Sequence, residues 1–214
     1  MAALRGSDSA LVVQECFRDP WTVVIDKPAG LLVQPGIGAH QQDSLITRLR
    51  EEEDPDLHLI HRLDRDTSGL VMVARGKESL RRWSALFAER RIRKLYAARV
   101  HGRLEGAGRI RVPLARLSRQ PPRYGAHPQG RAALTLWRRV DGGLDWTQLW
   151  LAPRTGRSHQ LRAHLCGIGH PILGDPIYSS DPLGRLHLHA VALRTRHPFT
   201  GEPFRLRSGQ LWPW

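Results

Sequence analysis

The stretch HRLDRDTSGL, residues 61–70, leads directly into the apolar residues VMVA at 71–74. Its second half, DTSG at residues 66–69, is typical of a turn, because short polar side chains bond nearby backbone groups and glycine accepts a positive φ. The apolar residues that follow the glycine predict a strand over residues 70–74. This part of the chain therefore predicts a charged turn that presents its side chains at the start of a buried strand.

Helices and strands are mixed along the rest of the chain without a strict strand–helix–strand alternation, which predicts an α+β fold. A helix is predicted over residues 77–90, where Leu80, Trp83, Leu86 and Phe87 share one face. The other predicted elements are strands at 11–13, 22–25, 95–100, 146–151 and 186–193, a helix from an Asp43 or Ser44 cap to about Glu52, a helix at 158–166, and a polar loop at 117–130.

The charge of the chain is strongly positive. Its 214 residues include 33 lysines and arginines against 20 aspartates and glutamates, a formal net charge of +13. Such a field favours a polyanionic partner, most often a nucleic acid. All but three of the basic residues are arginine, which grips phosphate with two parallel hydrogen bonds. A GC-rich coding sequence would also favour arginine over lysine, but it does not explain the net charge.

Composition argues against several classes of protein. No apolar run approaches the ~18 residues of a membrane span, and residues 1–17 lack the basic and apolar segments of a signal peptide. The two cysteines, Cys16 and Cys166, stand far apart, so neither a thiolate zinc site nor a disulfide framework is indicated. We therefore expect a cytoplasmic protein that has no membrane partner.

The spacing of carboxylates and histidines does not predict a metal site. The segment DRDTSG at residues 64–69 imitates the start of a calcium-binding EF-hand loop, but the twelfth position, which requires a bidentate glutamate, is Arg75. His187 and His189 share one face of a predicted strand and lack a third ligand nearby. Since no glycine-rich phosphate loop is complete either, we expect no metal and no nucleotide cofactor.

Two interpretations of Asp64 compete. A carboxylate that is oriented and kept ionised can act as a nucleophile, and Arg62 and Arg65 supply neighbouring positive charge. The same segment also has ordinary turn chemistry, in which Asp64 only bonds to nearby backbone groups. The local sequence by itself favours the turn.

A second segment changes this balance. The stretch TGRSHQLRAHL, residues 155–165, predicts a helix that opens at a Thr-Gly turn, where free backbone N–H groups can meet an anion. Arg157 and His159 fall in the predicted first turn. Because Leu161 anchors the buried face, we expect Arg162 to point at a specific partner rather than into solvent.

With both segments in view, the chain closely resembles the RluA-type pseudouridine synthases, which convert selected uridines of ribosomal or transfer RNA into pseudouridine. The resemblance runs from about residue 20 to residue 199. Several blocks match in the family's order, which is far more specific than any single block. The blocks are VVIDKPAGLLVQPG (23–36), HRLDRDTSGL (61–70), RKLYAARVHG (93–102), GRAALT (130–135), TGRSHQLRAHLCGIGHPILGDPIY (155–178) and LHLHA (186–190).

The resemblance implies roles for particular residues. Asp64 is the catalytic aspartate, Tyr96 packs against the target uracil and helps to remove the C5 proton, and Arg162 pairs with Asp64 and holds it ionised. Arg62 fills the gap left by the flipped base, and Leu188 lines the pocket. Whether Asp64 attacks C6, attacks C1′ or acts through a glycal stays open.

The resemblance also implies a fold: a large bent, mostly antiparallel mixed sheet with flanking helices, and two lobes around a central RNA-binding cleft. We expect a single catalytic domain over residues 1–214, no separate N-terminal RNA-binding module, no cofactor and a monomer. The expected substrate is a uridine in a structured loop of 23S ribosomal RNA or in a tRNA anticodon stem-loop. One candidate RNA-contacting face is the helix at 77–90 with its basic tail, which together carry Arg81, Arg82, Arg90, Arg91, Arg93 and Lys94.

Two other functions compete with this one. The first is a basic RNA-binding or ribosome-assembly protein that has no catalytic activity, and the second is a metal-dependent hydrolase of nucleic acid. The complete set of Asp64, Tyr96 and Arg162 favours the isomerase over the first, and the missing metal-ligand spacing disfavours the second.

Overall fold

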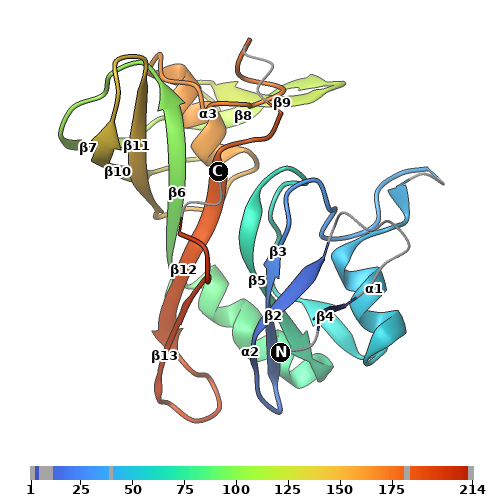
Figure 1. Ribbon diagram of the computed structural model, residues 1–214. Helices are drawn as coiled ribbons and strands as arrows, with labels where there is room; N and C mark the ends of the chain where they lie inside the picture. Colours follow the sequence, from blue (N-terminus) through green and yellow to red (C-terminus); the bar gives the residue numbers. More distant parts are fainter. Residues whose placement is uncertain (1–2, 5–11, 39–40, 181–183, 212–214) are drawn as a thin grey trace. The chain divides into compact units, whose positions relative to one another are not determined.

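The computed structural model describes residues 3–4, 12–38, 41–180 and 184–211. These residues fall into two compact units (Figure 1). Unit 1 contains the described residues up to Arg93 and those from Ala190 onward, and unit 2 contains those from Lys94 to His189. Each unit has its own apolar cores and is described by itself.

Unit 1 is built around a sheet whose defined strand pairs are all antiparallel. Its strands are β1 (Ala3–Leu4), β2 (Val13–Arg18), β3 (Thr22–Lys27), β4 (Leu57–Leu59), β5 (Ser68–Arg75), β12 (Leu188–Arg196, in unit 1 from Ala190) and β13 (Pro203–Arg207). Its helices are α1 (Leu45–Glu52) and α2 (Gly76–Ala88). The strands follow the order β1-β2-β3-β5-β12, with β4 added to β5 and β13 added to β12.

Strand β5 is apolar from Leu70 to Ala74 because both of its faces are covered. Val71 and Val73 pack into a core with Leu49 of α1, whereas Met72 packs into a second core with Trp83 of α2. Successive side chains of a strand point to opposite faces, so the two cores alternate along β5. Burial on both faces explains why this strand is a continuous apolar run rather than an alternation of apolar and polar residues.

Helix α1 begins where the sequence predicts it. Of the two expected caps, Ser44 is the N-cap, and its Oγ accepts a hydrogen bond from Thr47 N at 3.3 Å. Asp43 instead accepts two hydrogen bonds from the buried Arg48 side chain, each 2.6 Å long. The helix start is therefore held by Ser44, and Asp43 neutralises a buried charge on the same helix.

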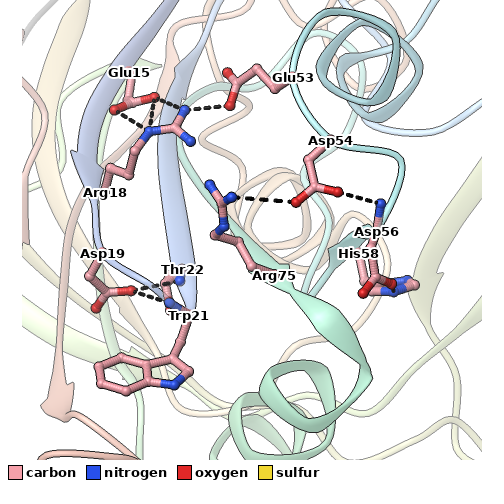
Figure 2. A network of polar contacts seen from close by, with 10 residues as sticks. All are labelled: Glu15, Arg18, Asp19, Trp21, Thr22, Glu53, Asp54, Asp56, His58 and Arg75. Atoms are coloured by element: carbon pink, nitrogen blue, oxygen red, sulfur yellow. Dashed lines mark hydrogen bonds and ion pairs between the residues drawn. The ribbon is translucent and has the colours of Figure 1, made fainter.

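Ion pairs tie the strands of unit 1 to the segment that follows α1 (Figure 2). The guanidinium of Arg18, at the end of β2, contacts the carboxylates of Glu15 and Glu53. Arg75, the last residue of β5, lies 3.4 Å from Asp54. Ion pairs this close to solvent contribute little each, but together they join β2, β5 and the segment after α1.

Unit 2 contains a run of paired strands and a two-stranded hairpin, β8–β9. The run has the order β6-β11-β10-β7, and its defined strand pairs are antiparallel. Leu161 and Leu165 of helix α3 (Gln160–Gly167) pack with Leu149 and Leu151 of β11. The elements of unit 2 are β6 (Arg93–His101), β7 (Ala107–Ile110), β8 (Leu114–Arg119), β9 (Pro122–Ala126), β10 (Thr135–Gly142), β11 (Trp146–Pro153) and α3 (Gln160–Gly167).

The predicted α+β fold class and its mostly antiparallel sheet are confirmed. The prediction of a loop over 117–130 is wrong, because residues 114–126 form the β8–β9 hairpin. The two strands are polar because most of their side chains face solvent. They are strands because their backbones pair with each other, not because an apolar face is buried. Within the described residues, no helix combines the length and the apolar character that a membrane crossing requires.

The predicted start of the third helix is also wrong. Helix α3 begins at Gln160, and His159 before it has a φ of 50°. Since a left-handed residue cannot continue a right-handed helix, Arg157 and Ser158 lie in a preceding turn rather than in the first helical turn.

Candidate active site

The HRLD segment forms a turn at the start of β5 in unit 1. Thr67 N donates to the carbonyl oxygen of Asp64 at 3.2 Å, which closes a four-residue turn with Asp64 in its first position. The Thr67 side chain is buried, and Leu63 packs against the core that contains α1. Asp64 is half-buried and Arg62 is exposed. The chain on both sides of Asp64 is thus fixed, while Asp64 itself is only half-buried.

Gly69 connects this turn to β5 by a close approach of two backbones. Its φ is 107°, and a Cβ atom at this position would lie 2.4 Å from the carbonyl oxygen of Ala190. Neither the conformation nor the space admits a side chain. The glycine of the HRLDRDTSGL segment is therefore required by the neighbouring backbone of β12 as well as by the turn.

Lys27, the last residue of β3, bonds to the backbone of the turn through its buried side chain. Its side chain is fully buried, and Nζ donates to the carbonyl oxygens of Pro28 and Leu31 at 2.8 Å and of Arg65 at 2.9 Å. These bonds use all three N–H donors of an ammonium group. Because Arg65 directly follows Asp64, the third bond fixes the backbone beside the predicted nucleophile.

These three hydrogen bonds form the Lys27 anchor, and the protonation state of Lys27 determines whether all three can form. Burial lowers the pKa of Lys27 to about 7, while the negative charges of Asp66, Asp64 and Asp26 act in the opposite direction. A neutral amine has only two N–H donors, so the protonated form alone satisfies all three carbonyl groups. The Lys27 anchor is therefore sensitive to pH near neutrality.

Arg162 is buried in α3 of unit 2, where it pairs with Asp175. Nε and Nη2 each donate to a carboxylate oxygen at 2.7 Å, and the side chains are 2% and 0% exposed. The same carboxylate accepts hydrogen bonds from the backbone N–H groups of Ile177 at 2.9 Å and Tyr178 at 3.1 Å. A buried ion pair persists when its remaining lone pairs are satisfied, as they are here. The expected pairing of Arg162 with Asp64, a residue of unit 1, stays a prediction.

The segment before α3 is bonded internally rather than left open. Oε1 of Gln160 accepts from Thr155 Oγ1 at 2.7 Å and from Arg157 N at 3.0 Å. Nε2 of Gln160 donates to Leu134 O and to Thr135 Oγ1, both at 3.1 Å. The N–H group of Arg157, which the sequence offers to an anion, is thus engaged by the first residue of the helix.

Tyr96 and Leu188 belong to one apolar cluster in unit 2. Tyr96 lies on β6 opposite Leu151 of β11, and it packs as a half-buried residue against a core that includes Leu188 and Leu161. Leu188 is 3% exposed. The structure therefore brings two of the five predicted site residues, Tyr96 and Leu188, to the same core.

The predicted RNA-contacting face on α2 is less available than its sequence indicates. Glu78 accepts hydrogen bonds from Arg81 at 2.8 Å and from Arg82 at 2.7 Å, which partly neutralises both arginines. Lys94 is half-buried rather than exposed, and burial lowers its pKa. The structure therefore weakens the case for α2 as the principal contact with phosphate.

Within the part of the chain that the structure describes, no group of three or more His, Cys, Asp or Glu side chains is placed to hold a metal ion. Of the histidine pair considered in the sequence, His189 lies in β12, and His187 directly precedes the first residue of that strand. The expectation that no metal takes part in the reaction stays a prediction.

Comparison with known proteins identifies the family. A family model described as RNA pseudouridylate synthase matches residues 22–166. This chain belongs to the RNA pseudouridylate synthase family. Members of this family are isomerases that act on RNA, so the sequence-based assignment to an RNA-modifying isomerase is confirmed.

Similar proteins extend the match to nearly the whole chain. The chain is 37% identical over 198 residues to the dual-specificity RNA pseudouridine synthase RluA of Yersinia pestis, which covers 89% of this chain and 96% of that protein. It is 35% identical over 208 residues to the ribosomal large subunit pseudouridine synthase D of Nitrosomonas europaea, covering 90% of this chain but 60% of that longer protein. A solved structure, human RNA pseudouridylate synthase domain containing 1, has 26% identity and a TM-score of 0.78, with 92% of this chain and 83% of that chain covered. The RluA-type resemblance and the fold class are thus confirmed.

Three structurally important residues were missed by sequence reasoning. Lys27, Asp175 and Tyr178 all lie in blocks that resemble the family, but no local pattern gives them a role. For Lys27 no local signal exists, because a lysine that follows a strand is usually exposed and its burial becomes visible only in the folded unit. For Asp175 and Tyr178 the relevant partners become visible only in the folded unit.

Proposed function

We propose that this synthase converts specific uridines to pseudouridine in structured RNA, either 23S ribosomal RNA or a tRNA stem-loop or both, and that Asp64 is its catalytic nucleophile. The observation that supports this proposal best is the turn at Asp64: Lys27 and Leu63 hold the backbone on each side, and Asp64 is only half-buried. A nucleophile needs this combination of fixed position and access.

The reaction is an isomerisation that breaks the N1–C1′ bond, turns the uracil and joins C5 to C1′. C5 loses its proton and N1 gains one, so the composition of the nucleoside is unchanged. Asp64 acts by attack on C6, by attack on C1′, or by assisting proton removal in a glycal route. The target base must leave its stack first, at a cost of about a few kcal/mol that is smaller in a loop than in a duplex. We propose that the exposed Arg62 fills the gap left by the flipped base.

The residues of unit 2 have complementary roles in the proposal. Tyr96 packs against the uracil and assists loss of the C5 proton, and Leu188 lines the pocket beside it. Arg162 favours the ionised form of Asp64 through its positive charge. The core shared by Tyr96 and Leu188 and the buried pair of Arg162 with Asp175 support these assignments, because a group that must meet a reacting base has to be held in one orientation.

The choice of substrate rests on the relatives. RluA of Yersinia pestis is described as having dual specificity, and the Nitrosomonas europaea relative as acting on the ribosomal large subunit. We propose a small structured loop as the target, read by its shape and by phosphate contacts. We further propose that the protein acts as a monomer in the cytoplasm and uses no cofactor.

The test compares Asp64→Asn with Asp66→Asn, which removes a charge from the same turn. Pseudouridine is quantified by mass spectrometry in 23S ribosomal RNA and in total tRNA from cells that lack the protein, after incubation with each variant. Asp64→Asn should abolish product while its affinity for RNA stays within about tenfold, because phosphate contacts lie elsewhere. Asp66→Asn should keep most of its activity. Full activity of Asp64→Asn would contradict the assignment.

A further inference from the structure

The positive charge of the chain is concentrated in one segment of unit 2. Between Glu105 and Asp141 the sequence contains no aspartate or glutamate. This segment includes the β8–β9 hairpin and contributes a large share of the net charge of +13. Its arginines are Arg109, Arg111, Arg116, Arg119, Arg123, Arg131, Arg138 and Arg139.

The hairpin presents its arginines to solvent without acidic partners. Arg116, Arg119 and Arg123 are exposed, and none of the ion pairs among the described residues includes them. Arg116 donates only to the carbonyl groups of Ser118 and Arg119, both at 3.1 Å. This differs from α2, where Glu78 engages two arginines. Guanidinium groups without anionic partners are suited to bind phosphate.

The hydroxyl group of Tyr178 fastens the hairpin to the body of unit 2. It accepts a hydrogen bond from Tyr124 N at 2.8 Å and donates to Tyr124 O at 3.0 Å, so it takes both backbone groups of one residue of β9. His159 Nδ1 lies 3.1 Å from the same hydroxyl oxygen. Because the hydroxyl has one proton and gives it to the carbonyl, His159 must donate from Nδ1. Figure 1 shows the yellow-green hairpin beside α3.

The other end of Tyr178 contacts the buried arginine. The guanidinium carbon of Arg162 lies 5.2 Å from the centre of the Tyr178 ring, and Tyr178 N donates to the Asp175 carboxylate that holds Arg162. Arg123 of the hairpin lies 5.6 Å from the same ring centre. One side chain therefore contacts β9 through its hydroxyl group and Arg162 through its ring.

We propose that the β8–β9 hairpin is a docking surface for the phosphate backbone of the substrate RNA, and that Tyr178 is a positioning residue that holds this surface in register with Arg162. The inference rests on the proposed function in one respect, namely that the partner is RNA. Phosphates bound by Arg116, Arg119 and Arg123 orient the RNA without reading its sequence. Tyr178 then determines where the bound strand lies relative to Arg162.

The first experiment measures binding of an in vitro transcribed tRNA anticodon stem-loop over a range of salt concentrations. The variant Arg116→Gln/Arg119→Gln/Arg123→Gln should bind at least tenfold more weakly at low salt. Its plot of log K against log salt should be shallower by about 2, the release expected for three phosphate contacts. The matched control, Arg194→Gln/Arg205→Gln/Arg207→Gln, removes the same charge from exposed arginines of β12 and β13. It should bind within about twofold of the parent.

Two outcomes would overturn the docking surface. Equal losses in both triple variants would mean that net charge alone governs affinity, and unchanged affinity of the hairpin variant would mean that RNA binds elsewhere. All binding is measured in the Asp64→Asn background, so the result does not depend on turnover. If no RNA acquires pseudouridine, the proposed function is contradicted. The difference in binding between the two triple variants still tests the docking surface, because it is measured without turnover.

The second experiment tests Tyr178→Phe, which keeps the ring beside Arg162 and removes only the hydroxyl group. The KM for the same stem-loop should rise severalfold with little change in kcat, and the salt dependence of binding should match the parent, because every arginine is retained. Trypsin should cleave the hairpin faster in the variant. A parental KM and a parental cleavage rate, measured on a variant whose circular dichroism matches the parent, would overturn the positioning role.

Discussion

Arg162 donates two hydrogen bonds of 2.7 Å to Asp175, and both side chains are inaccessible to solvent. The resemblance to pseudouridine synthases singles out Arg162 but not Asp175. Since a buried guanidinium without a counter-ion is very costly, the orientation of Arg162 depends on this carboxylate. Asp175 is thus a supporting residue whose loss should affect both stability and activity.

Asp175→Asn should lower the free energy of unfolding by about 3 kcal/mol, because it leaves a buried charge without its partner. Urea denaturation followed by circular dichroism measures this change. Asp141→Asn, an exposed position in the same unit, is the control and should change stability by less than about 0.5 kcal/mol. A loss below about 1 kcal/mol for Asp175→Asn would show that the pair is not needed to hold Arg162.

Lys27→Met should destabilise unit 1 by about 2–4 kcal/mol, because one buried and two partly buried carbonyl groups lose their donor. Some of this cost is offset, since burying an ammonium group is itself unfavourable. The backbone at Arg65 is released next to Asp64, so kcat should fall at temperatures where the variant remains folded. The control is Lys77→Met on the surface of α2. If the variant is destabilised but its kcat is unchanged, the Lys27 anchor contributes to stability and not to catalysis.

His164 should make stability fall on acidification. Its neutral ring accepts from Thr135 Oγ1 at 2.9 Å and donates to Val112 O at 3.0 Å, and burial lowers its pKa below the usual 6.5. As the pH falls below 6.5, His164 of the unfolded chain takes up a proton before His164 of the folded chain does. The stability that the neutral, buried His164 contributes is therefore lost progressively as the pH falls toward its lower pKa in the folded state. Urea denaturation at several pH values should show a weaker acid dependence for His164→Gln than for the control His127→Gln.

Arg62→Ala should impair turnover more on a structured stem-loop than on a flexible single strand that contains the same uridine. The proposed role of Arg62 is to fill the space left by a flipped base, and an unstacked strand leaves no such space. Single-turnover rates on the two RNAs measure the ratio, and Arg65→Ala in the same turn is the control. Equal losses on both RNAs would argue against a flipping role.

Chelation should leave the activity unchanged. No triad of potential ligands occurs among the described residues, and the proposed chemistry needs only a carboxylate and its neighbours. The rate of pseudouridine formation is compared before and after dialysis against EDTA. A clear loss that zinc or magnesium restores would favour a metal-dependent mechanism.

Local structure was largely predictable from the sequence. The strand at 70–74, the Ser44 cap and the helix after Gly76 follow from side-chain periodicity and capping chemistry, which depend on residues close together in the chain. The β8–β9 hairpin was missed because its exposed strands have no apolar periodicity to reveal them. The identities of Asp64, Tyr96 and Arg162 as candidates came from ordered blocks rather than from geometry.

The sequence by itself determined the family, the class of fold and the net charge that favours RNA. Only the tertiary structure decided which partners the key side chains have. Lys27 donates a hydrogen bond to Arg65, 38 residues later in the chain. Arg162 donates to Asp175, 13 residues later, and Tyr178 bonds to Tyr124, 54 residues earlier. Periodicity and capping report on neighbours within one or two turns of chain. The partner of a buried polar group is instead whichever donor or acceptor the fold brings within about 3 Å, and no local pattern contains that information.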